Sequence, residues 1–315
     1  MLSRLIVKIL SHLNMLKKIS LFSLFVFVNF TFAQTRYDIW PTNQIANSKG
    51  LKLDTKEEKE GRITQVSKPE IIAFLPAKEE RNNIAVIILP GGGYKHLTYD
   101  LGGYQYAKWL NTLGISAFVL NYRLPTSPDL IQPEIGPLQD VQAAIKTIRK
   151  NANSWGLKID KIGVLGTSAG GHLAAMSTNF TTDITGLKGD WSDINTQPDF
   201  AILISPVIDL GEFAHKGSRE NLLGKSASEE QIKKYSMQNQ VNEKTSPTLL
   251  IHAQNDTAVP VKNSLLYFDA LTQNNIKSAL FIFPEGGHAI GVTQPTGFTN
   301  YWKKLAEEWL SNYIK

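Results

Sequence analysis

The strongest constraint in this sequence is the pentapeptide Gly166-Thr167-Ser168-Ala169-Gly170, which separates the apolar run 162–165 from a segment of small residues, 171–177. A strand, a tight turn centred on serine and a helix, in that order, raise a serine hydroxyl above the edge of a sheet. Glycine at both ends leaves room for the strained turn and for close contact between helix and strand. The pentapeptide therefore predicts an α/β fold that exposes Ser168, although an ordinary strand-to-helix turn is the alternative.

A serine hydroxyl is a weak nucleophile unless a base accepts its proton and an acidic group orients that base. Where this turn occurs, the order along the chain is serine, acid, histidine. His288 lies in a glycine-rich loop directly after an apolar run and is the predicted base. Asp256 also follows an apolar run and precedes His288 by 32 residues, which leaves room for one helix and one strand. Asp256 is the predicted acid, and Asp209, one strand earlier, is the alternative.

Three other histidines follow the serine, and none has the position expected of a base. His172 lies four residues after Ser168 on the same predicted helix, so it is predicted to pack in the core. His252 ends a predicted strand and is predicted to be structural for the same reason. His215 stands in a polar loop with no pattern around it.

A hydrolase of this type also needs amide donors for the oxyanion that forms when serine attacks a carbonyl. The apolar run 84–89 leads directly into three glycines, 91–93, whose backbone can turn its amides toward a substrate. The predicted donors are the amides of Gly92, Gly93 and Ala169. A triple glycine alone is equally consistent with a plain turn. Together with the serine, the aspartate and the histidine, it predicts a serine hydrolase.

The first 33 residues are predicted to be a signal peptide rather than part of the fold. A basic pair, Lys17-Lys18, precedes the apolar stretch 19–32, and a small residue, Ala33, follows it. Translation from Met1 or from Met15 fits this arrangement. We therefore expect export to the periplasm or the medium, with no membrane anchor after cleavage. The chain has no cysteine, which excludes disulfides, a cysteine nucleophile and a lipid-modified cysteine.

The net charge of +5 comes mainly from the predicted signal peptide. Its four basic residues leave 29 basic and 28 acidic residues in positions 34–315, a formal charge of +1. A balanced charge gives no reason to expect a nucleic-acid partner.

Apolar runs that are typical of strands alternate with helical patterns, which predicts a mostly parallel sheet with helices on both faces. We expect a lead-in with the first strands over 34–83 and a catalytic domain over 84–315. Within it, the polar insertion 206–247 is expected to form a lid or one wall of the site. The predicted strands are 71–75, 84–89, 115–120, 162–165, 200–204, 248–251 and 280–283, and the predicted helices are 104–111, 138–153, 171–177, 264–273 and 301–313.

Several strings carry a resemblance to a known group. They are PGGGY (90–94), WLNTLGISAFVLNYRL (109–124), IGVLGTSAGGHLAA (162–175), ENLLG (220–224), HAQNDTAVPVKNS (252–264) and FPEGGHAIG (283–291). Over about 84–312 the chain resembles α/β-hydrolase esterases of the group that includes acetylxylan and feruloyl esterases. The resemblance implies Ser168 as nucleophile, His288 as base and Asp256 as the group that orients it. Thr167 departs from the group, in which an aromatic residue is common at that position.

The resemblance implies a secreted esterase that removes acetyl or feruloyl groups from polysaccharides through an acyl-enzyme, with an acylated carbohydrate as its partner. The chemistry requires no metal and no cofactor. Tyr94, Trp191 and Phe213 are predicted to stack on sugar rings. A secreted serine peptidase of the same fold and a catalytically dead carbohydrate-binding homologue are the alternatives. The sequence does not predict the oligomeric state.

Overall fold

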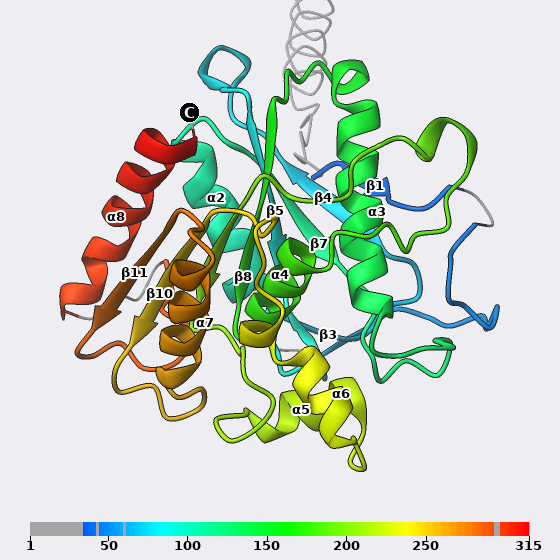
Figure 1. Ribbon diagram of the computed structural model, residues 1–315. Coiled ribbons are helices and arrows are strands. Elements are labelled where there is room, and N and C mark those ends of the chain that lie inside the picture. The colour runs from blue at the N-terminus through cyan, green and yellow to red at the C-terminus, as the bar shows by residue number, and fades with distance from the viewer. Residues whose placement is uncertain (1–33, 42–43, 59–60, 293–296, 315) are drawn as a thin grey trace, which may run out of the picture. The chain divides into compact units, whose positions relative to one another are not determined.

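An eight-stranded sheet forms the centre of the fold (Figure 1). Its first two pairs of neighbouring strands are antiparallel and all the others are parallel, which confirms the prediction of a mostly parallel sheet. The order across the sheet is β1 (Arg36–Asp38), β4 (Glu70–Phe74), β7 (Ser116–Asn121), β5 (Ile84–Leu89), β8 (Lys161–Thr167), β9 (Phe200–Ile204), β10 (Thr248–Ala253) and β11 (Ser278–Phe283).

This computed structural model describes residues 34–41, 44–58, 61–292 and 297–314. The predicted signal peptide, residues 1–33, lies outside the described residues. The predicted lead-in 34–83 is continuous with the main sheet, because it contributes β1 and β4. Among the described residues, no helix is both long enough and apolar enough to cross a membrane.

Helices cover both faces of the sheet, and this explains why β5 is apolar at every position. Ala85, Ile87 and Leu89 belong to one buried cluster, and the alternate residues of the strand belong to another. The first cluster includes side chains of α3 (Gly136–Asn151), α4 (Ala169–Asn179) and α7 (Lys262–Gln273). The second includes side chains of α2 (Gln105–Thr112) and α8 (Trp302–Trp309). Successive side chains of a strand point to opposite faces, so each face requires its own apolar set.

The structure contains elements that the sequence patterns did not predict. The insertion 206–247 holds α5 (Lys216–Leu223), α6 (Glu229–Tyr235) and the 3-10 turn η5 (Met237–Asn239). A second sheet pairs β2 (Lys56–Glu58), β3 (Arg62–Gln65) and β6 (Leu97–Thr98) in antiparallel order. The remaining short helical turns are η1 (Lys78–Glu80), η2 (Asp100–Tyr104), η3 (Asn153–Trp155), η4 (Gly189–Trp191), η6 (Gly297–Tyr301) and η7 (Leu310–Ile314).

Candidate active site

Ser168 occupies a strained turn between β8 and α4. Its backbone has φ 54° and ψ −121°, a conformation that a residue with a side chain rarely adopts. The flanking glycines are required by close backbone contacts. A Cβ at Gly166 would lie 2.2 Å from the carbonyl oxygen of Gly170, and a Cβ at Gly170 would lie 2.0 Å from that of Leu89. The turn therefore has the geometry that the pentapeptide predicted.

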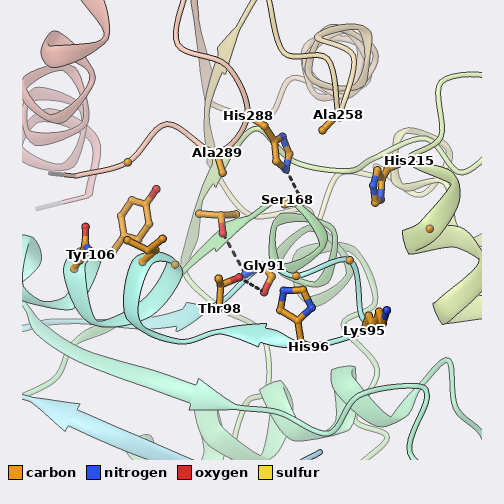
Figure 2. A pocket seen from close by; sticks show the side chains of 18 of the residues that line it. Gly91, Lys95, His96, Thr98, Tyr106, Ser168, His215, Ala258, His288 and Ala289 are labelled. Carbon is orange, nitrogen blue, oxygen red and sulfur yellow. Dashed lines mark hydrogen bonds between the residues drawn. The ribbon is translucent and has the colours of Figure 1, made fainter. Parts of the chain in front are cut away.

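Ser168, His288 and Asp256 form one hydrogen-bonded chain at the carboxyl edge of the sheet. The distance from His288 Nε2 to Ser168 Oγ is 2.9 Å, and that from His288 Nδ1 to Asp256 Oδ2 is 2.8 Å. Figure 2 shows His288 directed at Ser168. The Asp256 side chain is fully buried, whereas 29% of the His288 side chain is exposed. A carboxylate that accepts the Nδ1 proton leaves Nε2 free to accept the proton of the serine.

Asp256 is held as a carboxylate by the groups around it. Its Oδ1 accepts hydrogen bonds from the amides of Ala258 and Val259, both at 2.9 Å. His252 Nε2 lies 3.2 Å from Oδ2. Burial alone raises the pKa of Asp256, but the hydrogen bonds from His252, His288 and the Val259 amide outweigh burial and hold this pKa well below its usual range. The prediction that His252 is structural is consistent with this, because its imidazole is completely buried.

Asp209, the alternative acid, has other partners. Its carboxylate accepts hydrogen bonds from the Gln238 side chain at 2.9 Å, the Ser236 hydroxyl at 3.3 Å and the amide of Phe213 at 2.8 Å. All three belong to the insertion 206–247. Asp209 therefore anchors the insertion, and His288 bonds to Asp256.

The glycine loop after β5 presents backbone amides near Ser168. Gly92 and Gly93 have φ of 131° and 64°, so the chain turns in a way that glycine permits. Among the described residues, none accepts a hydrogen bond from the amides of Gly92, Gly93 or Ala169. Gly91 differs, since its amide donates to Thr167 Oγ1 at 3.2 Å. The amides of Gly92, Gly93 and Ala169 thus remain the predicted oxyanion donors, and no described residue competes for them.

The interpretation of Tyr94 as a sugar-stacking residue is wrong, because its side chain is fully buried. Its backbone has φ 59°, which turns the ring away from the cavity and into the core. The hydroxyl lies 2.8 Å from His172 Nδ1, and His172 Nε2 lies 2.7 Å from the carbonyl oxygen of Tyr235. A carbonyl only accepts, so His172 donates from Nε2 and accepts the Tyr94 hydroxyl at Nδ1. His172 is a buried structural residue, as predicted.

The other two predicted stacking residues do not line the cavity either. Trp191 packs against the core, and the ammonium of Lys150 lies 4.5 Å from the centre of its ring. Phe213 is half-buried in the insertion, with Lys262 Nζ 6.0 Å from its ring centre. Both aromatic rings therefore have packing partners away from Ser168.

A cavity of about 670 Å³ opens over Ser168 and His288. The insertion supplies part of its wall through His215, Gly217 and Asn221. Asn221 Nδ2 also donates a hydrogen bond of 2.8 Å to the carbonyl oxygen of Gly93. The polar loop around His215 and the string around Asn221 were in the sequence, but nothing there showed that they reach the glycine loop.

The described lining of the cavity carries little charge and has no cluster of metal-binding side chains. Among the described residues that line the cavity, Lys95 is the only one with a formally charged side chain, and none is an aspartate or a glutamate. His96 lies on the wall beside Lys95 (Figure 2), and the sequence had not pointed to it. Within the described parts of the chain, no group of three histidine, aspartate or glutamate side chains is arranged to bind a metal ion.

The sequence model of the BD-FAE family matches residues 72–271. The chain belongs to the BD-FAE family. This BD-FAE chain is 36% identical over 258 residues to the acetylxylan esterase of Xylanibacter ruminicola, covering 80% of this chain and 49% of the relative. It is 30% identical over 233 residues to endo-1,4-beta-xylanase B of Butyrivibrio fibrisolvens, covering 74% of this chain and 36% of the relative. The chain thus spans half or less of the length of these two relatives.

Solved structures of similar fold cover most of this BD-FAE chain. An acetyl ester-xyloside bifunctional hydrolase from Caldicellulosiruptor lactoaceticus aligns with a TM-score of 0.73 and 33% identity, covering 88% of this chain and 96% of the other. A thermophilic esterase from Thermogutta terrifontis aligns with a TM-score of 0.66 and 20% identity, covering 89% and 94%. The α/β-hydrolase fold and the esterase group that the sequence resembled are confirmed.

Proposed function

We propose that this protein is a serine esterase that removes acetyl groups from acylated carbohydrates. The observation that carries the proposal is the hydrogen-bonded chain from Ser168 Oγ through His288 to Asp256, at 2.9 and 2.8 Å, in the floor of a cavity. The acetylxylan esterase and the acetyl ester-xyloside hydrolase among its relatives support an acetylated sugar as the substrate.

The proposed reaction has two halves. Ser168 Oγ attacks the ester carbonyl while His288 Nε2 takes the hydroxyl proton, and the amides of Gly92, Gly93 and Ala169 donate to the oxyanion. His288 returns the proton to the sugar oxygen as the C–O bond breaks, which leaves an acetyl group on the serine. Water then attacks the acyl-enzyme by the same route, and acetate departs as the serine regains its proton.

The proposed substrate includes larger acyl groups as a secondary class. A cavity of about 670 Å³ is much larger than an acetyl group, so a feruloyl ester is the second substrate to assay. A peptidase that binds a free amino terminus would need a carboxylate for the ammonium group, and none of the described residues that line this cavity supplies one. The esterase is therefore favoured over an aminopeptidase of the same fold.

Acetate release from acetylated xylan by residues 34–315 tests the proposal. Ser168→Ala is the blank, and Ser192→Ala is the matched control, because Ser192 is an exposed serine whose hydroxyl donates to the carbonyl oxygen of Gly189. We expect release by the wild type and by Ser192→Ala, and none by Ser168→Ala. Cleavage of an aminoacyl anilide without acetate release would favour the peptidase. Binding of xylan without any turnover would favour a dead carbohydrate-binding protein.

We also propose that residues 1–33 direct export and are removed. The basic pair followed by an apolar stretch and Ala33 supports this proposal. Mass spectrometry of the protein from the periplasm or medium of an expressing bacterium is expected to find Gln34 at the amino terminus. Full-length protein that stays inside the cell would contradict it.

A further inference from the structure

His215 reaches the cavity from the insertion and has no role in the reaction described above. It is the N-cap residue of α5 and lines the cavity together with Ser168 and His288. Figure 2 shows His215 and Tyr106 on opposite sides of Ser168 and His288. His215 and His288 line the same cavity and lie close enough for their charges to interact.

The hydrogen bonds of His215 fix which ring nitrogen carries the proton. The amide of Ser218 donates to Nδ1 at 3.1 Å, and the Ser218 hydroxyl lies 2.8 Å from the same atom. A ring nitrogen that accepts from an amide N–H has no proton of its own, so a neutral His215 carries its proton on Nε2. No described residue accepts a hydrogen bond from Nε2.

The surroundings keep this imidazole neutral. Burial and the nearby His288 lower the pKa of His215, and Asp256 only partly opposes them. Two glycines flank the ring: a Cβ at Gly93 would lie 3.7 Å from its Cε1, and a Cβ at Gly217 would lie 3.3 Å from the same atom. The ring is thus half-buried between the glycine loop and α5, with a free N–H donor at the cavity.

We propose that His215 binds the alcohol part of the substrate by donating a hydrogen bond from Nε2 to a carbohydrate oxygen. This inference rests on the proposed esterase function. The sugar oxygen that leaves must lie beside His288, because His288 returns the proton to it. A hydroxyl or ring oxygen neighbouring the esterified position then falls on the wall that carries His215. A nitrophenyl ester offers no such oxygen next to its leaving group.

Two substitutions of His215 distinguish its role as a hydrogen-bond donor to the substrate from its role as the N-cap of α5. His215→Asn keeps an oxygen that can accept from the Ser218 amide, since asparagine is among the best N-cap residues, but it removes the donor at the cavity. His215→Gln places an amide N–H near the position of Nε2 and so restores the donor. Each variant is compared with wild type by kcat/KM on an acetylated xylo-oligosaccharide and on p-nitrophenyl acetate.

The proposal predicts a change in selectivity. For His215→Asn, the ratio of kcat/KM on the oligosaccharide to that on p-nitrophenyl acetate is expected to fall about 10-fold, the size expected for one lost hydrogen bond. His215→Gln is expected to recover most of this ratio. A ratio that stays at the wild-type value in His215→Asn, or an equal fall on both substrates, would overturn the proposal.

A binding measurement keeps this result distinct from the proposed function. The oligosaccharide is titrated calorimetrically into Ser168→Ala and into Ser168→Ala/His215→Asn, neither of which needs to turn it over. About 10-fold weaker binding by the double variant supports the role of His215, even if the wild type releases no acetate. Equal binding by the two proteins, or no binding by Ser168→Ala, would overturn it.

Discussion

Asp256 and Asp209 are both buried carboxylates that follow neighbouring strands of the sheet, and their partners decide which one serves His288. Asp256 Oδ2 bonds to His288 Nδ1, whereas the described partners of Asp209 all belong to the insertion. The low pKa of Asp256 keeps it charged at every pH where the protein is expected to work. A fixed negative charge orients His288 and stabilises the imidazolium that forms in the reaction.

Replacing each aspartate by asparagine compares the two directly. Asp256→Asn is expected to lower kcat on p-nitrophenyl acetate by about 10³- to 10⁴-fold, because the amide favours the wrong tautomer of His288. Asp209→Asn is the matched control and is expected to change kcat by less than about 10-fold. Steady-state kinetics at pH 7 on both proteins checks this. The reverse order of effects would identify Asp209 as the acid.

For single residues, the sequence predicted which positions belong to the site better than it predicted the directions of their side chains. Ser168, Asp256 and His288 were predictable because each follows a strand and because their order along the chain is constrained by the fold. The direction of the Tyr94 side chain was not predictable, since it depends on a backbone φ of 59° that no sequence pattern records. The direction of a side chain depends on the group to which it bonds, and the Tyr94 hydroxyl bonds to the buried His172.

Among the elements, α5 links the insertion to the glycine loop. Asn221 on α5 bonds to the carbonyl oxygen of Gly93, whose amide is a proposed oxyanion donor. Fixing a peptide group at its carbonyl oxygen also fixes the amides on either side of it. The string ENLLG at 220–224 was visible in the sequence, but its contact with residue 93 spans 128 positions and required the structure.

Asn221→Ala is expected to lower kcat about 10-fold, with a smaller change in KM, because the amides of the glycine loop stabilise the transition state more than the bound substrate. Asn239→Ala is the matched control: this exposed side chain of the insertion bonds to the carbonyl of Lys233, away from the cavity. Kinetics on p-nitrophenyl acetate checks the pair. A rise in KM alone for Asn221→Ala would argue for a binding role instead.

The apolar strand runs were predictable for a physical reason. Both faces of the sheet are covered, so strands such as β5 are apolar at every position and stand out in the sequence. The insertion was not recognised as helical, because α5 and α6 have eight and seven residues and are largely polar. Short polar helices lack the apolar periodicity on which sequence prediction depends.

In the molecule as a whole, His172 connects three segments that contribute to the site. It extends from α4, just after Ser168, and contacts Tyr94 of the glycine loop and Tyr235 of the insertion. Burial lowers the pKa of His172 to about 4, although its hydrogen bond to the Tyr235 carbonyl opposes this. The buried imidazole therefore remains neutral in the folded protein at pH values where an unfolded chain would protonate it.

The difference in the pKa of His172 between the folded and unfolded protein makes stability depend on pH. Between about pH 6.5 and pH 4 the unfolded chain binds a proton at His172 that the folded protein does not, so stability falls as pH falls through this range. We expect His172 to make the free energy of unfolding about 2 kcal/mol lower at pH 5 than at pH 7. Urea unfolding at both pH values measures the difference.

Two variants show whether His172 is responsible. His172→Gln is expected to reduce the difference between pH 5 and pH 7, because the titrating group is gone. Tyr94→Phe removes the hydroxyl that bonds to Nδ1 but leaves the buried imidazole, and it is expected to keep the difference. The same pH dependence in His172→Gln and wild type would contradict the assignment.

The most direct test of the account is to trap the nucleophile. A fluorophosphonate reacts with a serine that an adjacent histidine has activated, and mass spectrometry then locates the phosphonylated residue. We predict one phosphonyl group per chain, on Ser168, and at least about 100-fold slower labelling of His288→Ala. Labelling at another residue, or folded wild-type protein that remains unlabelled, would contradict the assignment of Ser168 as the nucleophile.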